Sequence, residues 1–164
     1  MEIERKYLVS ALPEHYKSFP SHLIEQAYLC TSPVVRIRKS DEDYYLTYKG
    51  KGLLAREETN LPLTKEAYDH LLPKADGIIL TKRRYLLPLS GFCASLPQAQ
   101  RGLTIELDVF EGRYAGLILA EVEFPTIEEA ENFQPPEWFG RDVTFSGEYQ
   151  NSRLSTLTGD GSER

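Results

Sequence analysis

Apolar and polar positions alternate along several short segments of the chain, as they do in strands that bury one face. In residues 2–9, Glu2, Glu4 and Lys6 share one face, opposite a mainly apolar face. The same alternation and the turn residues between segments predict further strands at 23–30, 34–40, 43–49, 54–61, 78–88, 103–111 and 117–124. Because their connections are short, the strands are expected to form an antiparallel sheet.

Helices are few in this pattern. The best one is predicted over residues 63–72, where Thr64 can cap the first turn. A second, short helix is expected after Pro125, capped by Thr126, and a helix or turn near 13–17. No linker or repeat divides the chain. We therefore expect one domain over residues 1–157, followed by a disordered tail over residues 158–164.

The polar faces of these strands are sorted by sign of charge. Arg36 and Arg38 share one face of their strand, whereas Glu106 and Asp108 share a face of theirs. For any single strand, exposure to water is enough to explain why one face is polar. Like charges two residues apart on one strand repel each other and add no stability, however. A bound polyanion would offset the repulsion among the basic residues, and metal ions would offset that among the acidic residues. Alternation alone leaves open whether this surface lies inside a barrel or on an open sheet.

Composition narrows the class of protein. The chain has 164 residues, of which 41% are hydrophobic, enough for one globular domain. Its net charge of -6 argues against a general nucleic-acid binder. No apolar run is long enough for a membrane span, and the charged N-terminus is unlike a signal peptide, so a cytoplasmic protein is expected. Cys30 and Cys93 are isolated, without metal-ligand spacing or a need for a disulfide.

The charged residues also form an ordered set of short motifs. These are E-x-E-x-K at Glu2, Glu4 and Lys6; R-x-R at Arg36 and Arg38; T-x-K-G at Thr47, Lys49 and Gly50; R-x-E at Arg56 and Glu58; K-x-R-Y at Lys82, Arg84 and Tyr85; E-x-D at Glu106 and Asp108; and A-E-V-E ending in Glu121 and Glu123. In order and spacing, from residue 1 to about 154, the set resembles the CYTH superfamily, the triphosphate tunnel metalloenzymes, and in particular their short bacterial members.

The resemblance implies an α+β fold: an eight-stranded antiparallel barrel that encloses a charged tunnel, with helices packed outside. It also implies a small polyanionic substrate, most simply inorganic triphosphate hydrolysed to pyrophosphate and phosphate, with Mg²⁺ or Mn²⁺ in two sites. The roles it implies are substrate binding for Lys6, Arg36, Arg38, Lys49 and Arg84; metal binding for Glu2, Glu4, Glu121 and Glu123; and, for Glu58, Glu106 and Asp108, binding of a second metal ion or orientation of water and basic residues.

The chain departs from the family's pattern at two places. Relatives often carry a lysine on a C-terminal helix, but no lysine follows Lys82 here. Tyr28, with Lys82 supplying charge, is our candidate for this catalytic role, although a packed core tyrosine is the simpler reading; Arg153 is a weaker candidate. Asn60 stands where relatives often have an acid, which is expected to weaken one metal position.

Other functions stay open at this point. A class IV adenylate cyclase would present the same tunnel charges, and a thiamine or nucleoside triphosphatase would differ only in its substrate. A polyphosphate- or nucleotide-binding module that lacks turnover is the alternative from outside the enzymes. Members of the family are often dimers, so a homodimer is a further expectation that no feature of the sequence locates.

Overall fold

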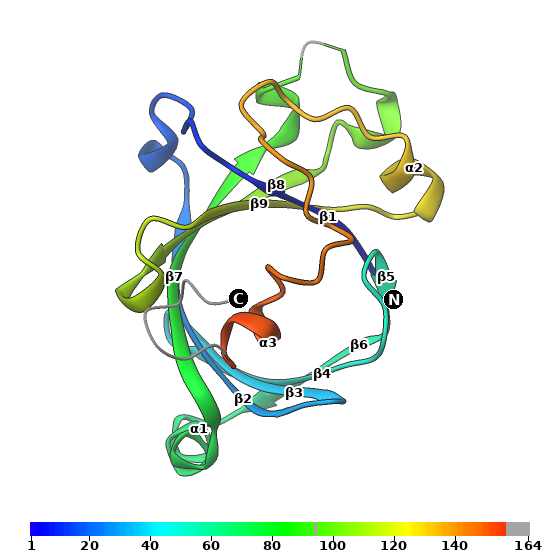
Figure 1. Cartoon of the computed structure of the whole chain (residues 1–164). Coiled ribbons are helices and arrows are strands. Elements are labelled where there is room, and N and C mark those ends of the chain that lie inside the picture. Colours follow the sequence, from blue (N-terminus) through cyan, green and yellow to red (C-terminus); the bar gives the residue numbers. More distant parts are fainter. Residues whose placement is uncertain (94, 157–164) are drawn as a thin grey trace.

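One antiparallel sheet, curved into a barrel, makes up most of the protein (Figure 1). The computed structural model describes residues 1–93 and 95–156, so the tail predicted over 158–164 lies outside the described residues. Within them the strands are β1 (Glu2–Leu8), β2 (Ser21–Thr31), β3 (Val34–Ser40), β4 (Asp43–Lys49), β5 (Ala55–Arg56), β6 (Glu58–Leu63), β7 (Asp76–Pro88), β8 (Thr104–Glu111) and β9 (Ile118–Glu123). Their order is β5-β1-β9-β8-β7-β2-β3-β4-β6.

The barrel closes through one interrupted segment. β5 pairs with β1, placing Arg56 opposite Glu2, and β6 pairs with β4, placing Glu58 opposite Lys49. The exposed Glu57 separates β5 from β6. The predicted strand 54–61 is therefore two strands, and the count is nine where eight were expected. The predicted antiparallel barrel with helices outside it is confirmed.

The helices are short. They are α1 (Lys65–Leu71), α2 (Ile127–Glu131) and α3 (Asn151–Leu154), with 3-10 turns η1 (Tyr16–Ser18), η2 (Leu72–Lys74), η3 (Leu89–Gly91), η4 (Gln98–Gln100) and η5 (Gly112–Tyr114). Both predicted caps are confirmed, because the hydroxyl of Thr64 accepts from the amide of Ala67 and that of Thr126 from the amide of Glu129. Within the described residues, no helix is long and apolar enough to cross a membrane.

The outer faces of the strands carry the hydrophobic core. Ile37 of β3 and Ala27 of β2 are fully buried in a cluster with Tyr68 of α1. On the other side of the barrel, Leu107 and Val122 belong to a larger cluster beneath α2 and the loops. Burying an aliphatic side chain of this size contributes about 1.5–3 kcal/mol. The outer faces therefore stabilise the barrel and leave the inner faces free for polar groups.

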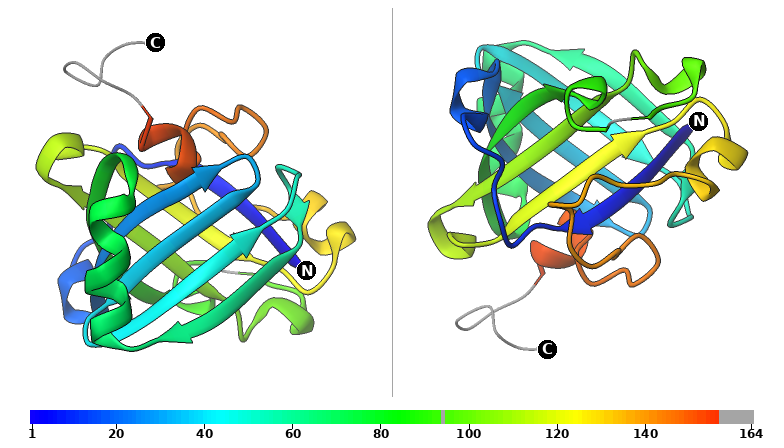
Figure 2. Two further views of the ribbon diagram at one scale, coloured as in Figure 1. Left: turned by 90° about the horizontal axis from the view of Figure 1, so that it is seen from below. Right: turned by 90° about the horizontal axis from the view of Figure 1, so that it is seen from above.

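α3 lies over one end of the barrel (Figures 1 and 2). Leu154 of α3 is buried in a cluster with inward-facing residues that include Tyr28, Leu80 and Phe110. β7 also holds the end of α3, because the amide of Ile78 donates to the carbonyl of Ser155 over 2.7 Å. Apolar side chains thus occupy the barrel at its α3 end, and the charged residues line the remainder.

Candidate active site in the barrel

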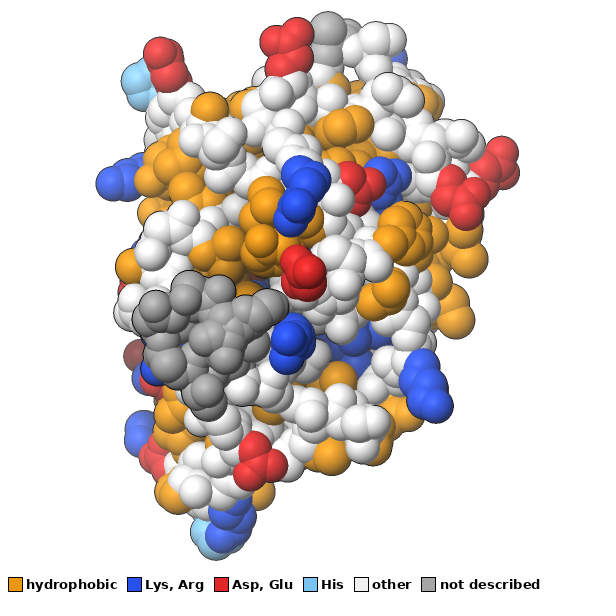
Figure 3. Space-filling model, in the orientation of Figure 1, with side chains coloured by type: hydrophobic (Ala, Val, Ile, Leu, Met, Phe, Trp, Pro, Cys, Tyr) orange, Lys and Arg blue, Asp and Glu red, His pale blue; other side chains and the backbone are white. Residues whose placement is uncertain are grey.

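A cavity of about 750 Å³ occupies the charged part of the barrel. The predicted site residues that line it are Glu2, Glu4, Lys6, Tyr28, Arg36, Arg38, Lys49, Glu58, Arg84, Glu106, Glu121 and Glu123. Asn151 and Ser152 of α3 also border it. Seen from the α3 end, basic side chains show in a hollow of the surface (Figure 3). The charged faces of the strands therefore point into the barrel, as the resemblance implies.

Lys82 and Asp108 are the two predicted site residues that the structure places behind this lining. Both side chains are fully buried, and the ammonium of Lys82 lies 2.7 Å from Oδ2 of Asp108. Burial is the main cause that lowers the pKa of Lys82 to about 7; Asp108 raises the pKa, and Arg84 and Arg38 lower it. Lys82 therefore lies outside the surface that lines the cavity.

Arg84 is the most heavily paired cation of the site. Its Nε and one terminal nitrogen reach both oxygens of Asp108 at 2.7 and 2.9 Å, and the other nitrogen lies 3.0 Å from Glu106. Burial alone would raise the pKa of Asp108, but Arg84 and Lys82 hold it below its usual value. With both oxygens already engaged, Asp108 suits the orienting role better than that of a metal ligand.

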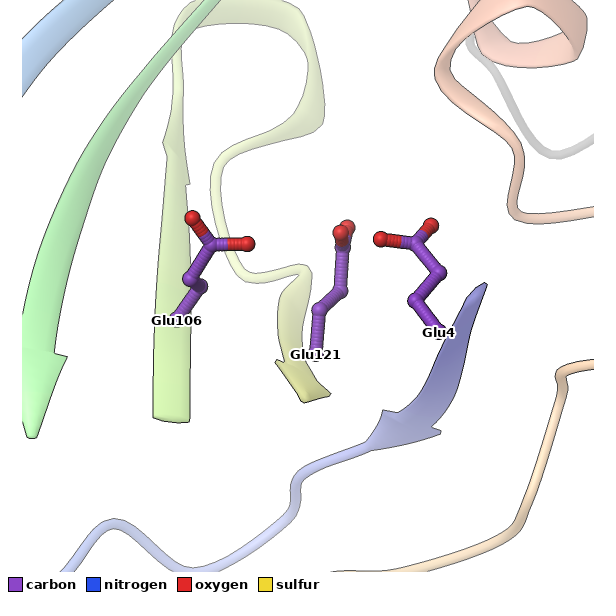
Figure 4. A group of neighbouring side chains, drawn as sticks. All are labelled: Glu4, Glu106 and Glu121. Atoms are coloured by element: carbon purple, nitrogen blue, oxygen red, sulfur yellow. The ribbon is translucent and has the colours of Figure 1, made fainter. Parts of the chain in front are cut away.

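Glu4, Glu106 and Glu121 form an acidic group on β1, β8 and β9. One carboxylate oxygen from each lies within 4.8 Å of the others, and the three side chains point toward one another (Figure 4). Burial and the neighbouring Glu121 and Glu2 hold the pKa of Glu4 well above its usual value. Oε1 of Glu121 is buried without a hydrogen-bond partner, with the ammonium of Lys6 3.6 Å away. A cation bound at this point would stabilise the ionised form of Glu4 and would give the buried oxygen of Glu121 a partner.

Glu2 and Glu58 have a different environment from the acidic group. The ammonium of Lys49 lies 3.0 Å from Glu2 and 3.2 Å from Glu58, while Nε of Arg56 lies 3.7 Å from Glu2. Burial alone would raise the pKa of Glu58, but its contacts with Glu2 and Lys49 lower it to about 2. Glu58 is therefore ionised at neutral pH. Glu123, exposed, also borders the cavity.

Arg36 and Arg38 of β3 are held by neutral side chains. Arg36 donates to the hydroxyl of Thr47 over 3.1 Å, and its buried Nε has no partner. Arg38 donates from Nε and a terminal nitrogen to Oε1 of Gln26 at 2.9 and 2.6 Å. Burial, together with Arg36 and Arg84, lowers the pKa of Arg38 to about 10, so it keeps its charge at neutral pH. Both guanidinium groups are thus available to an anion in the cavity.

A model of the CYTH domain matches residues 1–159. The chain belongs to the CYTH domain family. An inorganic triphosphatase of Nitrosomonas europaea is 37% identical over 158 residues, which cover 94% of this chain and 96% of the relative. One of Acetivibrio thermocellus is 34% identical over 161 residues, which cover 93% and 92%. The crystal structure of an inorganic triphosphatase matches with a TM-score of 0.67 and 32% identity, covering 96% of each chain.

The acidic group of this CYTH barrel fits a hard divalent cation. Its donors are carboxylate oxygens alone, the ligands that Mg²⁺ and Mn²⁺ prefer over the nitrogen and sulfur ligands of Zn²⁺. The unpartnered buried oxygen of Glu121 supplies an independent sign of a missing cation. Glu4 and Glu121 are predicted ligands of the main metal ion and Glu106 of a second ion, and the structure brings the three together; Glu2 and Glu123 are not part of this group.

Sequence reasoning missed two residues of the CYTH site. Arg56 borders the cavity and contacts Glu2, and it stands in the R-x-E motif without having been given a role. Gln26 holds Arg38 from the neighbouring strand. The signal for Gln26 was its place two residues before Tyr28, on the same face of the strand.

Proposed function

We propose that this chain hydrolyses inorganic triphosphate to pyrophosphate and phosphate with the help of a divalent metal ion. The observation that carries the proposal is one cavity in which guanidinium groups with unused donors stand across from a carboxylate group with an unpartnered oxygen. A triphosphate with its metal ion matches both halves. The curated relatives named as inorganic triphosphatases support the choice of substrate.

Phosphoanhydride hydrolysis depends mainly on positioning and on stabilising charge on the transferred phosphoryl group. In the proposed mechanism Arg36 and Arg38 bind phosphate oxygens through forked hydrogen bonds, and Lys6 and Lys49 add point charges. When bound, the divalent ion supplies charge neutralisation and a more acidic water molecule. Glu4, Glu106 and Glu121 would hold it.

The remaining residues have supporting roles in this proposal. Glu58, ionised through its contacts, orients Lys49 or contributes with Glu2 and Glu123 to a second metal ion. Tyr28 borders the cavity with its hydroxyl beside Gln26 and is proposed to contact the substrate. Lys82 adds positive charge from behind Arg84, and Asp108 keeps both of them in place.

The test is a comparison of substrates. The purified protein is incubated with inorganic triphosphate, ATP or thiamine triphosphate, each with Mg²⁺ or Mn²⁺, and the products are identified. Phosphate and pyrophosphate released fastest from inorganic triphosphate is the expected result. Cyclic AMP from ATP would replace the proposal with a cyclase, and tight triphosphate binding without any product would replace it with a binding module.

A pair of variants connects the activity to the barrel. Glu4→Gln removes a charge from the acidic group and should lower the rate at least about 100-fold, the scale of losing an electrostatic catalytic contact. Glu66→Gln, on the exposed surface of α1, is the matched control and should leave the rate unchanged. Equal rates for both variants would exclude the acidic group from catalysis.

A further inference from the structure

Gln26 is a fully buried polar residue inside the barrel. Its Oε1 accepts two hydrogen bonds from Arg38, at 2.9 and 2.6 Å, and its Nε2 donates to the hydroxyl of Tyr28 over 3.3 Å. Because arginine has no acceptor, the carboxamide oxygen must face Arg38 and the NH₂ group must face Tyr28. The orientation of this side chain is therefore fixed by its two partners.

The neutrality of Gln26 matters for Arg38. Arg84, the comparable cation on β7, contacts carboxylates of Asp108 and Glu106, which cancel much of its charge. Arg38 uses the same two nitrogens, but both donate to a single oxygen of an uncharged group, so its orientation is fixed while its charge stays available to the cavity. A glutamate at this position would keep the fork and remove the free charge.

The same contact affects Tyr28. Since Gln26 donates to the hydroxyl oxygen of Tyr28, the proton of that hydroxyl is not used in the contact. Tyr28 and Arg38 both border the cavity. A single side chain thus holds the guanidinium group of Arg38, with its remaining N–H donors, and the O–H donor of Tyr28 on adjacent strands at the cavity.

We propose that Gln26 is a positioning residue for triphosphate hydrolysis, which fixes Arg38 and Tyr28 relative to each other without neutralising the arginine. The inference rests on the proposed function, because it assigns to Gln26 the orientation of groups that would contact the triphosphate. It concerns a residue that touches neither the substrate nor the metal and acts through its two partners.

Two substitutions at Gln26 separate orientation from charge. Gln26→Met keeps the approximate shape, loses all three hydrogen bonds, and should lower kcat/KM for triphosphate by roughly 10- to 100-fold. Gln26→Glu keeps the fork but pairs the charge of Arg38 and, because a carboxylate has no donor, accepts from the Tyr28 hydroxyl, so it should raise KM at least about tenfold, more than it lowers kcat. Gln100→Met, at a buried glutamine outside the cavity, is the matched control for losing a buried carboxamide.

A double-mutant cycle distinguishes positioning from general support of the fold. In an Arg38→Ala background, Gln26→Met should cost less than about a third of its effect in the unchanged protein, because the group it orients is gone. Equal costs in both backgrounds, or an unchanged KM for Gln26→Glu, would overturn the proposal. Thermal unfolding of each variant shows whether the barrel is retained.

Direct binding of triphosphate, measured by calorimetry without turnover, separates this inference from the proposed function. If the unchanged protein binds triphosphate but does not hydrolyse it, the proposed function fails, and Gln26 is judged by whether Gln26→Glu weakens binding about tenfold. If turnover is present and both Gln26 variants bind and react normally, the inference fails alone. If the unchanged protein neither binds nor hydrolyses triphosphate, both fail.

Discussion

Two walls of the barrel carry basic side chains, but the partners of these side chains are uncharged on one wall and carboxylates on the other. The arginine wall consists of Arg36 and Arg38 of β3, held by the uncharged Thr47 and Gln26. The paired wall consists of Lys82 and Arg84 of β7, held by carboxylates of β8 and β9. A buried ion pair contributes little free charge and is costly to break, whereas a cation with a neutral partner is ready for an anion. The arginine wall therefore suits substrate binding, and the paired wall suits support.

The largest effect should come from breaking the paired wall. Asp108→Ala leaves Lys82 and Arg84 without their shared carboxylate, which should lower the free energy of unfolding by about 3–5 kcal/mol. Urea denaturation measures it. The control is Asp69→Ala, which removes the exposed pair with Lys65 and should cost far less than Asp108→Ala. A loss for Asp108→Ala as small as that of the control would contradict the structural role of the wall.

The arginine wall should respond in activity rather than stability. Arg38→Ala removes a cation that has only a neutral partner, so kcat/KM for triphosphate should fall at least about 100-fold. The free energy of unfolding should change much less than it does for Asp108→Ala. Arg83→Ala, on the opposite face of β7, is the control for losing an arginine. Near-normal rates for Arg38→Ala would remove the functional difference between the walls.

The sequence predicted both walls but could not predict how they differ. Alternation and charge sorting placed Arg38 and Arg84 on the polar faces of their strands, and the resemblance turned both faces inward and gave both residues the same role. Their difference depends on partners far away in the chain, Gln26 for one and Asp108 for the other. Strand alternation reports which face a side chain occupies, while cross-strand register decides what it meets there.

The barrel was predicted, but how it closes was beyond sequence reasoning for a similar reason. Nothing in residues 54–61 indicates that the segment pairs with β1 at one end and with β4 at the other. α3 has four residues, too few for a helical period, and its position depends on Leu154 entering the barrel and on the carbonyl of Ser155 bonding to β7. Long-range contacts rather than local propensity place both segments.

The paired wall also predicts a pH dependence of stability. The pKa of Lys82 is about 7 in the fold against a usual 10.5, so between these values the unfolded chain binds more protons than the folded one. The free energy of unfolding of the unchanged protein, relative to Lys82→Met, should therefore rise with pH across this window. The slope should approach, but not exceed, about 1.4 kcal/mol per pH unit. Parallel curves for the two proteins would show that Lys82 stays protonated throughout.

The smallest effect is expected where the arginine wall meets Glu58, the acidic residue of β6. Oδ1 of Asn60 accepts from Thr47, which itself accepts from Arg36, and Nδ2 of Asn60 donates to Glu58 over 3.3 Å. The amide therefore joins a carboxylate to the arginine wall without adding charge. Asn60→Asp would add a carboxylate beside Glu58 and remove that donor.

The additional charge should favour a divalent ion at this end of the cavity. The metal concentration for half-maximal activity of Asn60→Asp is expected to fall roughly threefold, because affinity follows the charge of the ligands. Asn60→Ala, which loses both contacts without gaining charge, is the control and should not lower it. Mg²⁺ and Mn²⁺ titrations at saturating triphosphate measure the shift. If both variants have the same metal requirement, Asn60 only positions Thr47 and Arg36, and the charge at this position does not affect metal binding.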